Sequence, residues 1–230
     1  KMIASSELPM TAQPSIGRFV ELYDELGKDG SQIISIHLMN SISGTVNAAR
    51  QAADITESTV TVVDSDFTSR SMGIIVREAA QAAKEGKSAE EVLAVIESTR
   101  QRTKLYLTVL NLDNLIKGGR ISRVMGAFSN LLNIKLFLEV INGKIEIVQK
   151  GRGLKSLQKK YDEVFEEMKA CPTGIQEIGI MHAGLNEFNQ SQIDTLRELF
   201  PEAKLTIVMT SPIIMSHTGV DAMAVTYLTK

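Results

Sequence analysis

Apolar and polar residues follow two alternating patterns along the first half of the chain. Short runs rich in β-branched and aliphatic residues predict strands over residues 32–38, 59–65 and 104–111. Intervening amphipathic or alanine-rich stretches predict helices over residues 15–26, 46–53, 72–85 and 88–102. Ser88 with Glu91 three positions later is a capping box, which marks a helix start. This order of strands and helices predicts a parallel sheet with helices on both faces.

The second half of the chain has a different pattern. Asn142-Gly143 separates the apolar runs 135–141 and 144–150, and Asn-Gly in this setting is a strong β-hairpin signal. Further helices are expected at 113–117, 124–132, 154–169 and 189–200, and further strands at 178–182, 205–209 and 222–228. A hairpin among helices predicts a mixed sheet. We therefore expect an α/β protein with an N-terminal domain over residues 1–127 and a C-terminal mixed α/β domain over residues 128–230.

Composition narrows the function. Hydrophobic residues make up 43% of the 230 residues, and 25 basic against 27 acidic residues give a net charge of -2. This balance argues against nucleic acid as a partner, and no apolar run is long enough for stable membrane insertion. The single cysteine, Cys171, cannot form an internal disulfide, which favours a cytoplasmic protein. Residues 1–6 read like the tail of a helix without an initiator, so we expect an N-terminally truncated or processed chain.

Two hydroxyl-bearing loops precede predicted helices. Ser43-Gly44-Thr45 follows the first strand, where α/β proteins bind ligands, and a helix start with two hydroxyls suits an anion. Thr11 precedes Pro14-Ser15 at the start of the first helix in a similar way. In both loops the residues alone favour a simpler interpretation, in which the hydroxyl groups cap the helix.

Three further positions carry candidate chemistry. His217, between Ser216 and Thr218, could donate to an anion or act as a general base, although a lone histidine is more often structural. Arg120 follows a double glycine and could contact a carboxylate or phosphate bidentately, unless it lies on a solvated turn. Arg152 lies between two glycines and near two lysines, which suits an acidic partner, a phosphate or simply a solvated helix start.

The usual catalytic patterns are absent from the sequence. It contains no glycine-rich dinucleotide or phosphate-binding fingerprint, no Gly-x-Ser-x-Gly motif and no metal-ligand spacing, so we expect neither a cofactor nor a metal. Ser43 and His217 could pair as nucleophile and base in a hydrolase or phosphotransferase. No third residue that would orient such a pair is evident.

Taken in order, several short motifs resemble those of the DegV family nearly end to end. They are Leu8-Pro9, Thr11-Ala12-Gln13-Pro14-Ser15, Ile34-Ser35-Ile36, Ser43-Gly44-Thr45, Val62-Val63-Asp64-Ser65, Gly118-Gly119-Arg120-Ile121-Ser122, Leu132-Asn133-Ile134-Lys135, Asn142-Gly143-Lys144-Ile145, Arg152-Gly153, His182-Ala183-Gly184 and His217-Thr218-Gly219. Each motif is weak alone, but the ordered set is highly specific.

The resemblance implies a protein that binds a long-chain fatty acid and catalyses nothing itself. It would hold the acid while a separate fatty acid kinase phosphorylates the carboxylate for phospholipid synthesis. The fold would be similar to the substrate-binding fold of dihydroxyacetone kinase, with two α/β domains. By motif match the ligand-binding residues would be Thr11, Ser43, Gly44, Thr45, Arg120, His217 and Thr218, and Arg152 would dock the kinase.

Three departures from the family pattern bear on these expectations. The usual opening strand and its Asp-Ser loop are missing, Ala12 replaces a serine, and Val220-Asp221 replaces Pro-Gly. An acidic residue near the carboxylate end could weaken anion binding or change the contact with the kinase. A sensor of another apolar acid remains an alternative.

Overall fold

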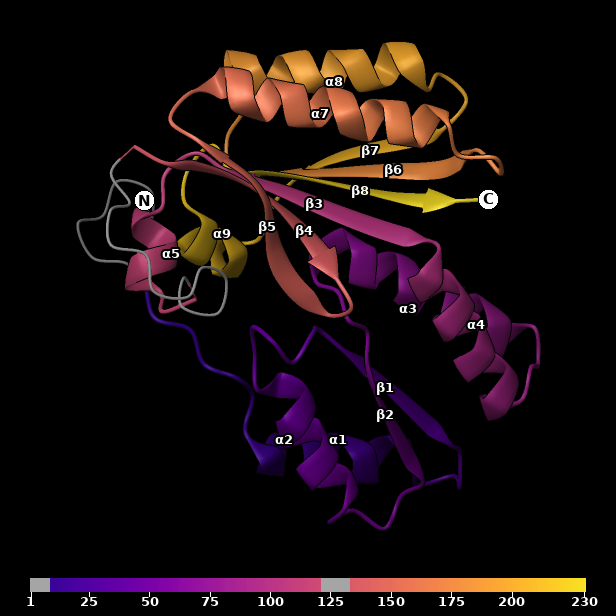
Figure 1. Ribbon diagram of the computed structural model, residues 1–230. Helices are drawn as coiled ribbons and strands as arrows, with labels where there is room; N and C mark the ends of the chain where they lie inside the picture. Colours follow the sequence, from indigo (N-terminus) through magenta and orange to yellow (C-terminus); the bar gives the residue numbers. More distant parts are fainter. Residues whose placement is uncertain (1–8, 121–132) are drawn as a thin grey trace. The chain divides into compact units, whose positions relative to one another are not determined.

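The computed structural model describes residues 9–120 and 133–230, which form two compact units (Figure 1). In its described parts, the larger unit comprises the chain up to Thr11, Arg102–Ile141 and Ile145–Lys230. The smaller unit comprises Ala12–Gln101 and Asn142–Lys144. The domain boundary expected near Ala127, the helix expected over 124–132 and the motif residues Ile121 and Ser122 all lie outside the described residues.

The smaller unit contains two parallel strands, β1 (Ile33–His37) and β2 (Val60–Asp64). Helices α1 (Ile16–Leu26) and α2 (Thr45–Ala53) pack on one side of them. Alanines on the buried face of α2 let this helix approach closely, and they form a core together with α1 and the strands. The buried members of this core are Phe19, Tyr23, Ala48, Ala49 and Ala52.

Two longer helices of the smaller unit, α3 (Ser69–Lys84) and α4 (Ala89–Gln101), pack against each other. The capping box expected at the start of α4 is present. The Ser88 N–H donates to Glu91 Oε2 at 2.7 Å, and the Glu91 N–H donates to Ser88 Oγ at 3.3 Å. The start of α3 is different, since its N-cap Thr68 makes no side-chain capping bond.

The larger unit is built on a six-stranded sheet with the order β5-β4-β3-β8-β6-β7. Its strands are β3 (Thr103–Val109), β4 (Lys135–Ile141), β5 (Lys144–Gly151), β6 (Ile175–His182), β7 (Lys204–Met209) and β8 (Met223–Thr229). β6 and β7 run parallel, whereas β3 is antiparallel to both β4 and β8, so the expected mixed sheet is confirmed. The expectation that β3 extends the parallel sheet of the first half is wrong, because a local apolar pattern specifies a strand but not its neighbours.

The expected hairpin turn joins β4 and β5, which are neighbours in the sheet. Asn142 has a φ of 49° and Gly143 a φ of 69°, the left-handed pair that a two-residue turn requires.

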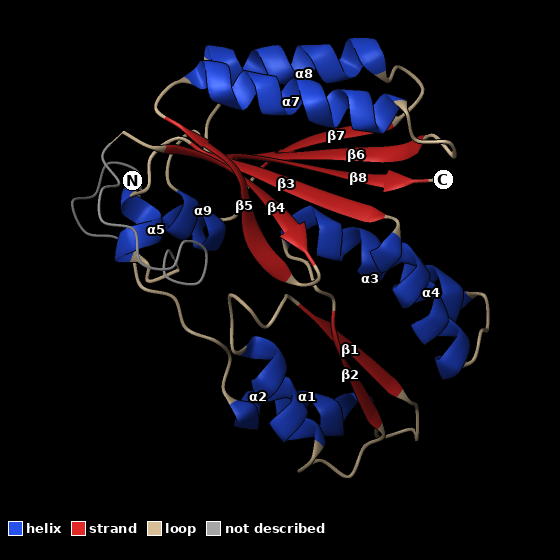
Figure 2. Cartoon of the chain, viewed as in Figure 1, coloured by secondary structure: helices blue, strands red, loops and turns tan. Residues whose placement is uncertain are grey.

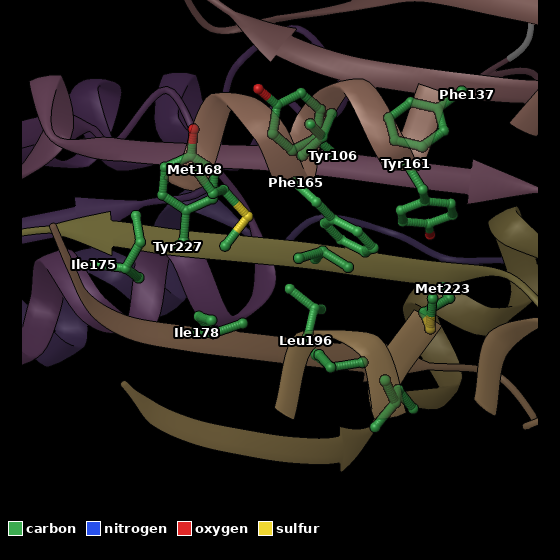
Figure 3. Packing of buried hydrophobic residues seen from close by; sticks show 14 of the residues in the cluster. Tyr106, Phe137, Tyr161, Phe165, Met168, Ile175, Ile178, Leu196, Met223 and Tyr227 are labelled. Atoms are coloured by element: carbon green, nitrogen blue, oxygen red, sulfur yellow. The ribbon is translucent and has the colours of Figure 1, made fainter. Parts of the chain in front are cut away.

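Helices cover both faces of the larger sheet (Figure 2). On one face, α7 (Leu154–Lys169) and α8 (Glu187–Leu199) bury an aromatic core, in which Phe137 and Tyr161 meet edge to face with ring centroids 4.9 Å apart (Figure 3). On the other face lie two short helices, α5 (Asp113–Lys117) and α9 (Pro212–Thr218). The sequence predicted α5 but not α9, although Ser211 caps α9 and Pro212 occupies its first turn.

Candidate functional site

Several of the predicted ligand-binding residues meet where α5 and α9 lie side by side in the larger unit. We call Thr11, Asn114, Gly118, Arg120 and His217 the α5–α9 polar cluster. Thr11 precedes the smaller unit in the chain, Asn114 and Gly118 belong to α5 and its C-cap, and His217 lies in the last turn of α9. Three residues predicted separately from the sequence, Thr11, Arg120 and His217, are thus brought together.

His217 is the centre of this cluster. Its Nε2 lies 2.9 Å from Thr11 Oγ1, a hydrogen bond whose direction depends on the tautomer of the ring. Burial, and then the positive charge of Arg120, lowers the pKa of His217 below its ordinary value. The imidazole is therefore neutral at pH 7, so Arg120 supplies the positive charge of the cluster.

The two glycines before Arg120 are required for different structural reasons. Gly118 lies against His217, since a Cβ atom at this position would be 2.5 Å from His217 Nδ1. Gly119 has a φ of 68°, in the left-handed region that favours glycine. The resulting turn lets Arg120 Nη1 donate to the Gly118 carbonyl at 2.7 Å, which holds the guanidinium beside the histidine.

Thr218, also predicted to bind ligand, is buried and donates its hydroxyl proton to the Ile214 carbonyl at 3.1 Å. The proton is therefore used within α9, and Thr218 could donate to a ligand only by breaking this bond. Its role in binding stays a prediction.

The loop Ser43-Gly44-Thr45 belongs to the smaller unit. Ser43 Oγ lies 2.8 Å from Thr45 Oγ1 and accepts from the Thr45 N–H at 3.3 Å. Gly44 is the N-cap of α2 and has no side chain to cap it, but Ser43 Oγ accepts from the N–H of Thr45, the first residue of the helix, so Ser43 caps α2 from one position before the usual one. A Cβ atom on Gly44 would lie 2.0 Å from Gln13 Oε1, which shows that the Gln13 side chain lies over this loop.

Arg152 is exposed in the turn between β5 and α7. Gly153 is the N-cap of α7, so a basic side chain stands beside the start of this helix. The exposure fits a docking residue and fits a solvated turn equally well, and the predicted role of Arg152 stays a prediction.

The other two histidines are placed differently. His37 lies on β1, where Ser35 Oγ is 2.7 Å from its Nε2 and Phe19 meets its ring edge to face at 5.2 Å. Tyr23 extends this chain of hydrogen bonds, with its hydroxyl 2.7 Å from Ser35 Oγ. His182 ends β6, and its pKa is lowered by burial. His37 therefore packs against the core through the buried Phe19.

Sequence reasoning missed Asn114 and Gln13. The Asn114 side chain donates to the Ser216 carbonyl at 3.1 Å, so its partner is a backbone atom far away in the chain. No sequence pattern identifies such a contact. Gln13 lies within the motif Thr11–Ser15, in which only the hydroxyl residues were considered as ligands.

A family model described as uncharacterised proteins of the DegV family matches residues 1–230. The chain belongs to the DegV family. A DegV domain-containing protein from Streptococcus pneumoniae is 40% identical over 224 residues, which cover 97% of this chain and 79% of that protein.

Solved DegV structures share the fold. DegV of Bacillus subtilis, described as a fatty acid binding protein, has a TM-score of 0.85 at 30% identity and covers 97% of this chain and 80% of its own. A DegV family protein from Ruminococcus gnavus, in a structure with vaccenic acid, has a TM-score of 0.76 at 25% identity, again covering 97% and 80%. The small parallel sheet and the larger mixed sheet are therefore the DegV architecture.

Within residues 9–120 and 133–230, no helix has the length and apolar character needed to cross a membrane. In the same ranges, no group of three or more His, Cys, Asp or Glu side chains is arranged to hold a metal ion.

Proposed function

We propose that this DegV-family chain binds a long-chain fatty acid and presents it to a separate fatty acid kinase. The observation that carries the proposal is the α5–α9 polar cluster, in which a charged guanidinium, a neutral imidazole and a threonine hydroxyl meet. The B. subtilis and R. gnavus relatives, whose fold this chain shares, are described with fatty acids.

The cluster has the chemistry that a partly desolvated carboxylate requires. Such a group is costly to bury unless a charge and hydrogen-bond donors compensate it. Arg120 supplies the charge, and Thr11 can donate its hydroxyl proton when His217 Nε2 carries a proton and donates to Thr11 Oγ1. His217, kept neutral by burial and by Arg120, then acts through Thr11.

The two ends of the ligand have different roles. Each buried methylene contributes about 0.8 kcal/mol, so a long acyl chain gains on the order of 10 kcal/mol before entropic costs. A charge-assisted hydrogen bond contributes about 1.5–3 kcal/mol. The tail should therefore dominate affinity, while the polar residues orient the carboxylate for phosphoryl transfer.

The remaining parts of the proposal follow the family resemblance. Ser43, Gly44, Thr45 and Thr218 would contribute further polar contacts to the ligand, Arg152 would dock the kinase, and the protein would act in the cytoplasm. An enzymatic role for Ser43 with His217 is less favoured, because the hydrogen bonds of these side chains go to Thr45 and Thr11.

The proposal is tested by extracting the purified protein with organic solvent and identifying released lipid by mass spectrometry. We expect a stoichiometric long-chain fatty acid. Arg120→Met should lower the amount retained, whereas Arg152→Met, a matched change at an exposed arginine, should leave it unchanged. An extract without fatty acid, together with no uptake of added vaccenic acid, would contradict the proposal.

A further inference from the structure

Helix α9 carries His217, but the helix is too short to be stable without contacts to the rest of the larger unit. It spans only seven residues, and a helix this short is marginal without tertiary contacts. On the sheet side, Met215 packs with Ala183 and Ala222. These contacts are apolar and lie two residues before His217, so they leave the rotation of the last turn to other interactions.

Asn114 supplies such an interaction. Its amide donates to the Ser216 carbonyl at 3.1 Å, in the residue directly before His217. The same side chain lies against the end of α9, since a Cβ atom on Gly219 would be 3.3 Å from Asn114 Oδ1. A larger residue than glycine at 219 would therefore press on Asn114.

The backbone of Asn114 also acts on His217, through Gly118, which lies against the Nδ1 edge of the imidazole ring. Its carbonyl accepts from the Gly118 N–H at 2.8 Å, which closes the turn that brings Gly118 against His217 Nδ1. One residue thus holds α9 through its side chain and Gly118 through its main chain.

The two edges of the His217 ring then differ. Nε2 is hydrogen-bonded to Thr11, whereas Nδ1 is buried and has no hydrogen-bond partner within the described parts of the chain. Arg120 is bonded to the carbonyl of Gly118, the residue that lies against Nδ1, and its positive charge acts on the ring. A nearby cation favours a lone pair over an N–H at Nδ1, so the proton belongs on Nε2.

We propose that Asn114 is a positioning residue for fatty acid binding, which together with Gly118 holds His217 in the Nε2–H tautomer that donates to Thr11. In this arrangement the Thr11 hydroxyl proton is available to the ligand carboxylate. The inference rests on the proposed function but concerns residues outside the predicted ligand-binding set.

Nitrogen-15 NMR of labelled imidazole tests the proposal, in a His37→Gln/His182→Gln background where His217 is the single histidine. The background protein should show the Nε2–H tautomer and a single carboxyl signal for vaccenic acid labelled with carbon-13 at the carboxyl group. Asn114→Leu should mix the tautomers, shift the carboxyl signal and raise the dissociation rate of the acid about tenfold.

Three further variants separate positioning from stability. Gly118→Ala should disturb the His217 signals in the same way, because its methyl group displaces the ring from the other side. Asn114→Asp keeps the shape without the donor, and should act likewise if Asn114→Leu does not fold. Gln192→Leu removes a fully buried amide bonded to Gln158 between α7 and α8, and should lower stability without changing either signal.

The possible outcomes are distinct. Unchanged His217 and carboxyl signals in the folded Asn114 variants, while the background protein binds the acid, would overturn the positioning role and leave the proposed function standing. Absence of binding in the background protein would overturn the proposed function, and the ring signals without lipid would still decide whether Asn114 sets the tautomer.

Discussion

Each of the three histidines in the chain has a pKa lowered by partial burial. Neighbouring charges change the pKa of His217 and the pKa of His37 in opposite directions. The charge of Arg120 lowers the pKa of His217 further, whereas the charge of Asp64 acts in the opposite direction on His37. All three rings are therefore neutral at pH 7, and each accepts a proton more readily in the unfolded chain.

Stability should consequently fall as the pH drops below about 6.5, the ordinary histidine pKa. Between this value and the lower folded-state pKa values the unfolded chain binds more protons, so the free energy of unfolding rises with pH across this window. It should be fully recovered above pH 7. Urea denaturation at intervals between pH 5 and pH 7.5 measures the slope.

The His37→Gln/His182→Gln variant provides the control for this pH dependence. With one titrating ring left, it should lose most of the slope in the same window. An equal slope in this variant and in the wild-type chain would show that other groups are responsible.

At the scale of residues, the structure brings together three positions that the sequence predicted from motifs. Thr11, Arg120 and His217 were named through the order of short motifs, since their local patterns alone favoured caps and solvated turns. Asn114 could not be found, because its side chain bonds to a backbone carbonyl 102 residues away. Tertiary hydrogen bonds to the main chain leave no trace in side-chain patterns.

Among the helices and strands, those whose full pattern lies within a short stretch of sequence were predicted best. Helix α7 has the predicted bounds because a long amphipathic repeat defines it, and the hairpin follows from its Asn-Gly turn. The seven-residue helix α9 was missed, because fewer than two helical repeats cannot be told from a loop. The predicted pairing of β3 was wrong, since strand pairing depends on the whole sheet and not on the local sequence.

The capping box of α4 leads to a prediction about this helix. Ser88→Ala should lower the free energy of unfolding by about 1 kcal/mol, because an N–H group at the helix start loses its acceptor. Thr68→Ala at the start of α3 should have a smaller effect, since Thr68 makes no capping bond. Denaturant titration of both variants measures the difference, and equal losses would contradict the role of the side-chain bond.

A second prediction concerns the attachment of α7 to the sheet. Glu167 accepts hydrogen bonds from two phenols, Tyr227 at 2.9 Å and Tyr106 at 3.2 Å. Burial is the main cause that raises the pKa of both tyrosines, so both remain protonated donors. Glu167→Ala should therefore cost about 1–2 kcal/mol of stability by leaving two phenols without their acceptor.

The neighbouring Glu166 gives a matched control for this change. It is exposed and pairs with Lys169 on the helix surface, an ion pair of small expected value. Glu166→Ala should barely change the denaturation midpoint, and a loss as large as that of Glu167→Ala would refute the contribution of the phenols.

At the scale of the whole molecule, the proposed function implies that lipid retention and delivery to a kinase are separable. Arg152→Glu should leave the extracted fatty acid unchanged while lowering the rate of acyl phosphate formation by on the order of tenfold, because a docking charge mainly affects association. Ser43→Ala should likewise reduce transfer more than retention.

Mass spectrometry of bound lipid and a coupled kinase assay measure the two quantities. Lys159→Glu, a charge reversal at an exposed residue of α7, is the control and should retain normal transfer. Loss of the lipid itself on Arg152→Glu would contradict the separation of retention and delivery.

The position of β8 in the larger sheet affects how long neighbouring strands stay unpaired during translation. This strand lies between β3 and β6, and its Thr226 bonds to Lys104, 122 residues earlier in the chain. Ribosomes add about 5–20 residues per second, so β3 emerges on the order of ten seconds before its partner. During that interval β3 exposes an unpaired edge, and β6 does so from its own emergence until β8 follows, and strands of other chains can add to such edges. The nascent chain is therefore expected to depend on chaperones that shield such edges during translation.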